Sequence, residues 1–321
     1  MTTGTKLAAL DLGSNTFRLI VADFKDGSPA WETKKVWQSI PRISEGLIPN
    51  GRFAQAPRHR ALQALEEFAD IIAALGPSRV LAGGTMAFRQ AADGAEFLTE
   101  ASNRYGWEAF VLSGSQEARL SALGVMTALA PLPDEGLIFD IGGRSTEFIN
   151  TSRRELLQTQ SLAMGVVGLT ETHVRSDPPA PSELAAMTSQ VHSILQNADW
   201  SAVGRPTLVG TAGTVTTVAA MLMKLVDYDA AAVNNQTFGR HQIGRLLDLL
   251  AGQKINQRLS HPGLHPRRAD VIVAGLVEVT GIMDFFGQDL LTVSDNSLLE
   301  GLWLACADLV PLGQTTHEVI P

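Results

Sequence analysis

Two aspartates stand at the same position of two similar segments, where each follows an apolar run and precedes a glycine-containing turn. Asp11 follows the apolar residues 7–10, and Asp140 follows residues 137–139. A carboxylate at the end of a strand, followed by glycine and small polar residues, is typical of a turn that presents backbone N–H groups to an anion. A single glycine-rich turn is more often a simple hairpin, so the repetition carries the argument for phosphate chemistry.

Each copy continues into a second alternating segment, residues 17–24 in the first copy and 146–150 in the second. Each copy is therefore predicted to be a β-hairpin with a carboxylate near its tip, and the chain to be a duplicated domain. The tip residues that can donate hydrogen bonds to phosphate are Ser14, Asn15, Gly142, Gly143, Arg144 and Ser145.

An arginine and a glutamate follow two further predicted strands in the first half of the chain. Arg89 comes after the strand 79–82 and a glycine turn, where its fork of donors could reach phosphate. Glu117 comes after the strand 108–112, in the first turn of a helix capped by Ser113, where it could act as a general base. An exposed arginine and a glutamate that favours a helix N-terminus remain alternatives.

A third glycine-rich turn follows the strand 207–209 and begins a helix that runs through Leu222. A helix N-terminus offers free backbone N–H groups to an anion. The residues predicted to bind phosphate there are Gly210, Thr211, Gly213 and Thr214. His261 and His265 lie in a proline-rich loop whose spacing fits no zinc pattern, so they predict no metal site.

Length and composition allow two domains of ordinary size. The chain has 321 residues, of which 45% are hydrophobic and 18% charged, and turn and linker signals occur at residues 26–29 and 131–133. It has no apolar run of eighteen residues and no signal pattern in its first fifteen, so we expect a cytoplasmic protein without a membrane partner. The single Cys306 excludes an intrachain disulfide, and the net charge of −8 disfavours nucleic acid as a partner.

Five motifs, taken in order, resemble those of the exopolyphosphatase / guanosine pentaphosphate phosphohydrolase (Ppx/GppA) family, which belongs to the actin-like ATPase superfamily. They start at Asp11, Ser113, Asp140, Gly210 and Pro262, and the resemblance covers nearly the whole chain. It implies an α/β fold of two ribonuclease H-like (actin-like ATPase) domains with a cleft between them. Domain I is expected over residues 1–125 and completed by the C-terminal helix at about 297–321, and domain II over 126–296.

The resemblance also implies roles for the acidic residues. Glu117 is implied to be the general base on the attacking water, and Asp140 to hold Mg²⁺ directly or through water, with Glu147 beside the metal and Asp11 at the corresponding place in the first hairpin. Arg89 matches a phosphate-contacting arginine. The implied activity is release of terminal phosphate from polyphosphate or guanosine pentaphosphate, and a homodimer is usual for the family.

Two departures from the family pattern bear on activity. Arg144 stands where a third glycine is usual, so either the turn is ordinary there, or Arg144 is an extra anion ligand, or the site is impaired. Gln116 replaces a common carboxylate beside Glu117. A non-catalytic sensor of hyperphosphorylated guanine nucleotides, a small-molecule kinase of the same superfamily and an actin-like filament protein remain open alternatives.

Overall fold

The chain divides into two compact units. The computed structural model describes residues 4–25, 32–129, 133–153 and 155–312, so the turn predicted at 26–29 and most of the linker predicted at 131–133 lie outside the described residues. The first unit runs to Thr127 and takes up the segment from Asn296, and the second runs from Ala128 to Asp295. The last helix, α13 (Leu298–Cys306), thus belongs with the first unit.

The first unit contains a five-stranded mixed sheet in the order β3-β2-β1-β4-β5. Its strands are β1 (Lys6–Leu12), β2 (Phe17–Asp23), β3 (Glu32–Ser39), β4 (Arg79–Gly84) and β5 (Glu108–Val111). β1 pairs with β2 in antiparallel register, so the predicted hairpin that contains Asp11 is confirmed. On its other side, β1 pairs with β4 in parallel register.

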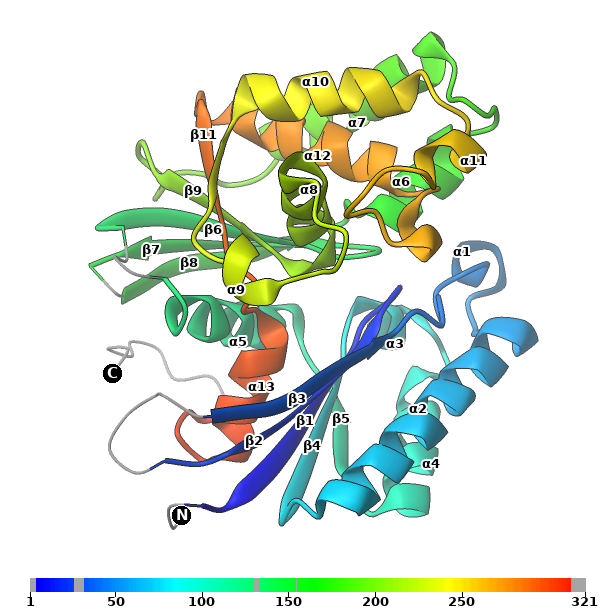
Figure 1. Cartoon of the computed structure of the whole chain (residues 1–321), viewed down its shortest axis with the longest axis vertical. Coiled ribbons are helices and arrows are strands. Elements are labelled where there is room, and N and C mark those ends of the chain that lie inside the picture. The colour runs from blue at the N-terminus through cyan, green and yellow to red at the C-terminus, as the bar shows by residue number, and fades with distance from the viewer. Residues whose placement is uncertain (1–3, 26–31, 130–132, 154, 313–321) are drawn as a thin grey trace. The chain divides into compact units, whose positions relative to one another are not determined.

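Helices cover both faces of this sheet (Figure 1). α2 (Gln55–Leu75) and α4 (Gly94–Tyr105) share one apolar core with the sheet, and α5 (Gly114–Met126) packs with α13 on the other side. α5 and α13 cross closely, since a Cβ on Gly124 would lie 1.9 Å from the carbonyl oxygen of Ser297. The short helices α1 (Leu47–Asn50) and α3 (Met86–Gln90) complete the unit.

The second unit repeats this topology. Its sheet has the order β10-β11-β9-β6-β7-β8, in which the run β8-β7-β6-β9-β11 corresponds to β3-β2-β1-β4-β5 with the same strand directions. The strands are β6 (Glu135–Ile141), β7 (Thr146–Ser152), β8 (Glu155–Leu162), β9 (Thr207–Thr211), β10 (Thr237–Gly239) and β11 (Leu290–Val293). The prediction of two ribonuclease H-like domains is confirmed.

One buried helix organises the helical layer of the second unit. α12 (Ile272–Phe285) packs against four other helices and is apolar on almost every face, as a buried helix must be (Figure 1). Its partners are α6 (Val166–His173), α7 (Pro181–Gln196), α8 (Ala212–Met223) and α10 (Arg240–Ala251). Shorter turns lie at α9 (Ala230–Val233), α11 (Ile255–Arg258) and a 3₁₀ helix (Pro266–Arg268).

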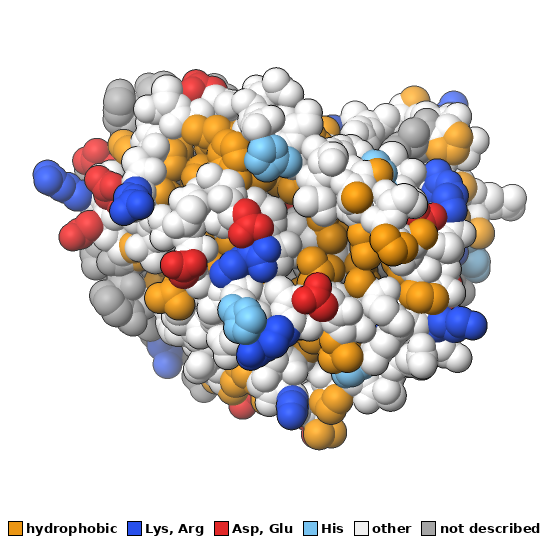
Figure 2. Space-filling model, turned by 90° about the horizontal axis from the view of Figure 1, so that it is seen from above, with side chains coloured by type: hydrophobic (Ala, Val, Ile, Leu, Met, Phe, Trp, Pro, Cys, Tyr) orange, Lys and Arg blue, Asp and Glu red, His pale blue; other side chains and the backbone are white. Residues whose placement is uncertain are grey.

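Charges of both signs occur on the face of the molecule that Figure 2 shows. On the face shown in Figure 2, the Lys and Arg side chains of the described residues are interspersed with acidic ones and form no continuous basic area. Among the residues that the structure describes, no helix is both long and apolar enough to cross a membrane.

Candidate active site

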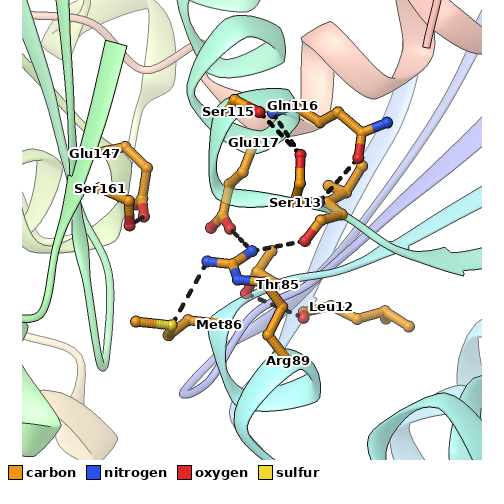
Figure 3. Close-up of polar contacts among 11 residues, drawn as sticks. Leu12, Thr85, Met86, Arg89, Ser113, Ser115, Gln116, Glu117, Glu147 and Ser161 are labelled. Carbon is orange, nitrogen blue, oxygen red and sulfur yellow. Dashed lines mark hydrogen bonds and ion pairs between the residues drawn. The ribbon is translucent and has the colours of Figure 1, made fainter. Parts of the chain in front are cut away.

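The first unit brings Arg89 and Glu117 together. Arg89 is in α3, which follows β4, and Glu117 is in the first turn of α5, which follows β5. The Arg89 Nη1 lies 2.6 Å from the Glu117 Oε2 and also donates to the carbonyl oxygen of Leu112 at 2.8 Å (Figure 3). The Arg89 and Glu117 side chains are only 20% and 9% exposed. Arg89 is therefore not a freely solvated arginine, and the Glu117 carboxylate is fixed by its ion pair with Arg89.

The predicted capping box at the start of α5 is confirmed. The Ser113 Oγ accepts from the backbone N–H of Gln116 at 3.2 Å, and the Gln116 Oε1 accepts from the backbone N–H of Ser113 at 2.9 Å. Gln116 therefore completes the cap, and the cap fixes the turn from which Glu117 projects.

Asp11 meets a partner that we did not predict. Asp11 and Arg18 are register partners across the hairpin, and the Asp11 Oδ2 accepts from Arg18 Nη2 at 2.9 Å and Nε at 3.2 Å. Arg18 also donates to the Ser297 Oγ of the α13 cap at 2.5 Å. Burial raises the pKa of Asp11, whereas the charge and hydrogen bonds of Arg18 act to lower it. The implied role of Asp11 near a metal stays a prediction, and Arg18 already compensates its charge.

The tip of this first hairpin is buried and held by the loop after β3. The carbonyl oxygens of Ser14 and Asn15 accept from the backbone N–H groups of Ser44 and Arg42, both at 3.1 Å. Ser14 and Asn15 are 4% and 9% exposed. The loop thus fixes the backbone of the two residues predicted to donate to phosphate.

The second hairpin places two carboxylates opposite each other. Asp140 on β6 and Glu147 on β7 are register partners in an antiparallel pair, so their Cβ atoms lie on one face of the sheet, about 4.5–5.5 Å apart. The Glu147 Oε1 accepts from the Ser161 Oγ of β8 at 2.7 Å (Figure 3). The predicted pair of acidic residues is therefore adjacent, and its mutual repulsion favours a bound cation.

The turn between β6 and β7 is fixed from behind by α6. The carbonyl oxygens of Gly142 and Gly143 accept from the backbone N–H groups of residues 166 and 167 at 3.2 and 2.8 Å. Gly165 caps α6 so closely that a Cβ there would lie 2.7 Å from the backbone nitrogen of Arg144. Because these carbonyls are engaged with α6, the peptide planes of the turn have a set orientation.

Arg144 follows the first of the three alternatives drawn from the sequence, an ordinary turn. Its backbone does not have a positive φ. Its side chain is 2% exposed and turns toward α6, where its Nη2 lies 2.6 Å from the Glu171 Oε2. Gly168 of α6 lies beside the guanidinium, since a Cβ there would be at ordinary contact distance, 3.8 Å, from Nη1. Binding of substrate phosphate by Arg144 stays a prediction.

Arg144→Gly is expected to lower the free energy of unfolding by about 1.5–3 kcal/mol, because Glu171 loses a charge-assisted hydrogen bond and α6 loses packing. The KM of the variant for the phosphate substrate should equal that of wild type, at low and at high salt. Chemical denaturation with Glu171→Gln and the double variant measures the coupling of the pair. If Arg144 instead contacts substrate, KM rises in the variant and the effect weakens at high salt.

The third glycine-rich turn lies beside the second hairpin within the same unit. The Thr214 Oγ1 donates to the carbonyl oxygen of Ile141 at 3.4 Å, and Thr211 is fully buried. Arg268 covers the first turn of α8: its Nη1 donates to the Thr217 Oγ1 at 3.1 Å and would lie 2.0 Å from a Cβ on Gly213. We did not predict this cation, although its Arg-Ala-Asp segment is one of the recognised motifs.

The residues of the second hairpin fit a magnesium ion in chemistry and placement. Mg²⁺ prefers carboxylate oxygens and is usually held by one or two carboxylates, water and substrate phosphates. Asp140 and Glu147 supply such a pair. Within the described ranges, no group of three or more His, Cys, Asp and Glu residues forms a metal cage. The fit is therefore to a metal shared with substrate rather than to a closed structural site.

Two ribonuclease H-like domains with opposed carboxylates and three glycine-rich turns define a class of phosphate-handling proteins. Within that class, the sequence profile of the Ppx/GppA phosphatase family matches residues 21–309. The chain belongs to this family.

Several relatives support this assignment over nearly the whole chain. Exopolyphosphatase 2 of Mycobacterium tuberculosis is 31% identical over 94% of this chain and 99% of its own length. The guanosine-5'-triphosphate,3'-diphosphate pyrophosphatase of Aeromonas hydrophila is 28% identical over 92% of this chain, but over 58% of its own length. The solved structure of an Aquifex aeolicus Ppx/GppA enzyme has a TM-score of 0.78 at 30% identity and covers 94% of this chain and 99% of that one. A Cytophaga hutchinsonii exopolyphosphatase has a TM-score of 0.88 at 26% identity, over 96% of this chain and 100% of that one.

Proposed function

We propose that this protein hydrolyses a terminal phosphoanhydride bond and releases orthophosphate. The observation that carries the proposal is the Arg89–Glu117 pair, because it holds a carboxylate beside a guanidinium at the start of α5, within the residues that match the family. Family membership and the names of relatives at about 30% identity support the same reaction.

The chain's own groups account for the chemistry. A water oxygen attacks the terminal phosphorus of the substrate, and a proton of that water passes to Glu117. The bond from phosphorus to the bridging oxygen breaks, and the rest of the substrate leaves with the electron pair of that bond. Arg89 orients Glu117 through Nη1, and its remaining N–H groups can bind phosphate oxygens. The turn after β6 and the start of α8, both in the second unit, are the further segments proposed to bind phosphate through backbone N–H groups, although the N–H of Gly142 itself donates to the carbonyl oxygen of Ser145 at 2.9 Å.

Mg²⁺ is the proposed cofactor, with Asp140 and Glu147 as the residues that would hold it. When bound, the ion would neutralise charge on the phosphoryl oxygens. Asp11 is the remaining predicted carboxylate, and its bond to Arg18 makes it the weaker candidate.

Inorganic polyphosphate is the first substrate to test. The relative of nearly equal length is named an exopolyphosphatase, whereas the chain spans 58% of the guanosine-nucleotide pyrophosphatase. Guanosine pentaphosphate is the second candidate, because it presents the same terminal bond.

Phosphate release from both substrates, measured with Mg²⁺ and again after chelation, tests the proposal. We expect release with at least one substrate and its loss on chelation. Tight binding of either substrate without release would instead identify a sensor. The proposed homodimer and cytoplasmic location are checked by light scattering and by cell fractionation.

A further inference from the structure

Glu278 is a buried carboxyl group that the proposed reaction does not use. It lies in the middle of α12, among apolar residues, and its exposed fraction is 0%. Its Oε1 contacts the Thr146 Oγ1, and its Oε2 has no hydrogen-bond partner among the described residues. Buried carboxyl groups are rare unless they are paired or neutral, so this one requires a reason.

The number of protons available for hydrogen bonds indicates whether Glu278 is protonated or ionised. The Thr146 Oγ1 lies at hydrogen-bond distance from two acceptors, the Glu278 Oε1 and the carbonyl oxygen of Met164, the latter at 3.0 Å. One hydroxyl has a single proton and can donate to only one of them. Both contacts are satisfied if Glu278 is protonated and donates to Thr146, which then donates to Met164.

The surroundings of Glu278 favour the same neutral form. The pKa of Glu278 is raised to about 8, chiefly by burial; the bond with Thr146 lowers it, and the charge of Glu147 raises it. One turn to either side, α12 meets uncharged neighbours: Thr214 and Val166 at Gly275, and Val191 at Gly281. Among the described residues, the groups that shift the pKa of Glu278 include no cation, and the Oε2 of an ionised Glu278 would be left without a donor.

This hydrogen-bond chain ends at the phosphate hairpin. Thr146 is the first residue of β7 and directly precedes Glu147. Met164 directly precedes Gly165, the cap residue of α6 that lies against the turn at 142–145. These hydrogen bonds thus link α12 to Thr146, next to Glu147, and to Met164, next to the glycine that packs against the 142–145 turn.

We propose that Glu278 is a neutral positioning residue, which donates its proton to Thr146 and so fixes Glu147 and the 142–145 turn against α12. Its effect on turnover rests on the proposed function, whereas its protonated state does not.

Steady-state phosphate release tests the positioning role. Glu278→Leu, which donates nothing, and Thr146→Val are each expected to lower kcat by about 10-fold, the equivalent of one buried hydrogen bond. Glu278→Gln and Thr146→Ser keep a donor and should stay within about two-fold of wild type. Thr151→Val is the matched control, since the Thr151 Oγ1 bonds to Gly136 at the other end of β7. The proposal is overturned if Glu278→Gln loses as much as Glu278→Leu, or if neither loses activity.

Two measurements test the protonated state without activity. The infrared difference between wild type and Glu278→Gln at neutral pH should contain the carbonyl band of a carboxylic acid. The folded-state pKa lies above the ordinary value of 4.5, so the stability that Glu278 contributes is present below about pH 4.5 and lost as pH rises to about 8. Glu278→Gln should therefore exceed wild type in Tm by several degrees at pH 8 and converge with it near pH 5. A missing carboxylic acid band, or parallel Tm curves, would overturn the proposal even if wild type releases no phosphate.

Discussion

Glu117→Gln is expected to lower kcat for phosphate release by about 10²–10⁴-fold and to leave substrate affinity unchanged. The amide has the shape of the carboxylate and can still accept from Arg89, which lies 2.6 Å from Glu117. It cannot take a proton from water. The loss should therefore fall on the chemical step alone, which single-turnover phosphate release and calorimetric binding of the same substrate measure separately.

The matched control for this variant is Glu67→Gln, an exposed glutamate of α2 in the same unit. It should behave as wild type in both assays. Near-normal turnover in Glu117→Gln would place the general base elsewhere. A large loss of affinity would instead show that Glu117 acts mainly by holding Arg89 in place for substrate.

The duplicated fold could be predicted because its signals are local. The repeat of an apolar strand, an aspartate and a glycine turn, at Asp11 and Asp140, predicts a hairpin in each unit, and both hairpins are present. The capping box at Ser113 could be predicted for the same reason, since both partners lie within four residues. Local spacing also placed Glu117 on the right helix turn.

The partners of the site residues could not be predicted from local spacing. Arg18 meets Ser297 across 279 positions of the sequence, and Thr146 meets Glu278 across 132. Such contacts depend on how helices pack on a sheet, which periodicity does not specify. One signal was available: a lone glutamate within the apolar run that forms α12 must be buried, and a buried acid needs a partner.

The direction of Arg144 shows the same limit. The sequence showed an arginine in a turn where glycine is usual, and three outcomes were open. The outcome was decided by Glu171 of α6, which supplies an ion-pair partner for the guanidinium. A helix that lies beyond the hairpin in the sequence, α6, thus determines where a turn side chain points.

Asp140→Asn is expected to lower kcat/KM on the order of 10³-fold, about 4 kcal/mol of lost transition-state stabilisation, and to remove the response to Mg²⁺. The reason lies in the hairpin register: Asp140 and Glu147 oppose each other, and the second carboxylate alone leaves a site of half the charge. The change in Tm with Mg²⁺ concentration, measured without substrate, reports binding of the metal independently of catalysis. Wild type and Glu117→Gln should both gain Tm with Mg²⁺, and Asp140→Asn should not.

Glu135→Gln separates this effect from a general loss of charge on the strand. Glu135 is the exposed first residue of β6, at the other end from Asp140, so its variant should keep both the activity and the magnesium response. If Asp140→Asn and Glu117→Gln lose substrate affinity equally, the division of labour between metal carboxylate and general base is wrong. If Asp140→Asn alone loses the magnesium response, the second hairpin holds the metal, and the loss of turnover in Glu117→Gln does not come from loss of the metal.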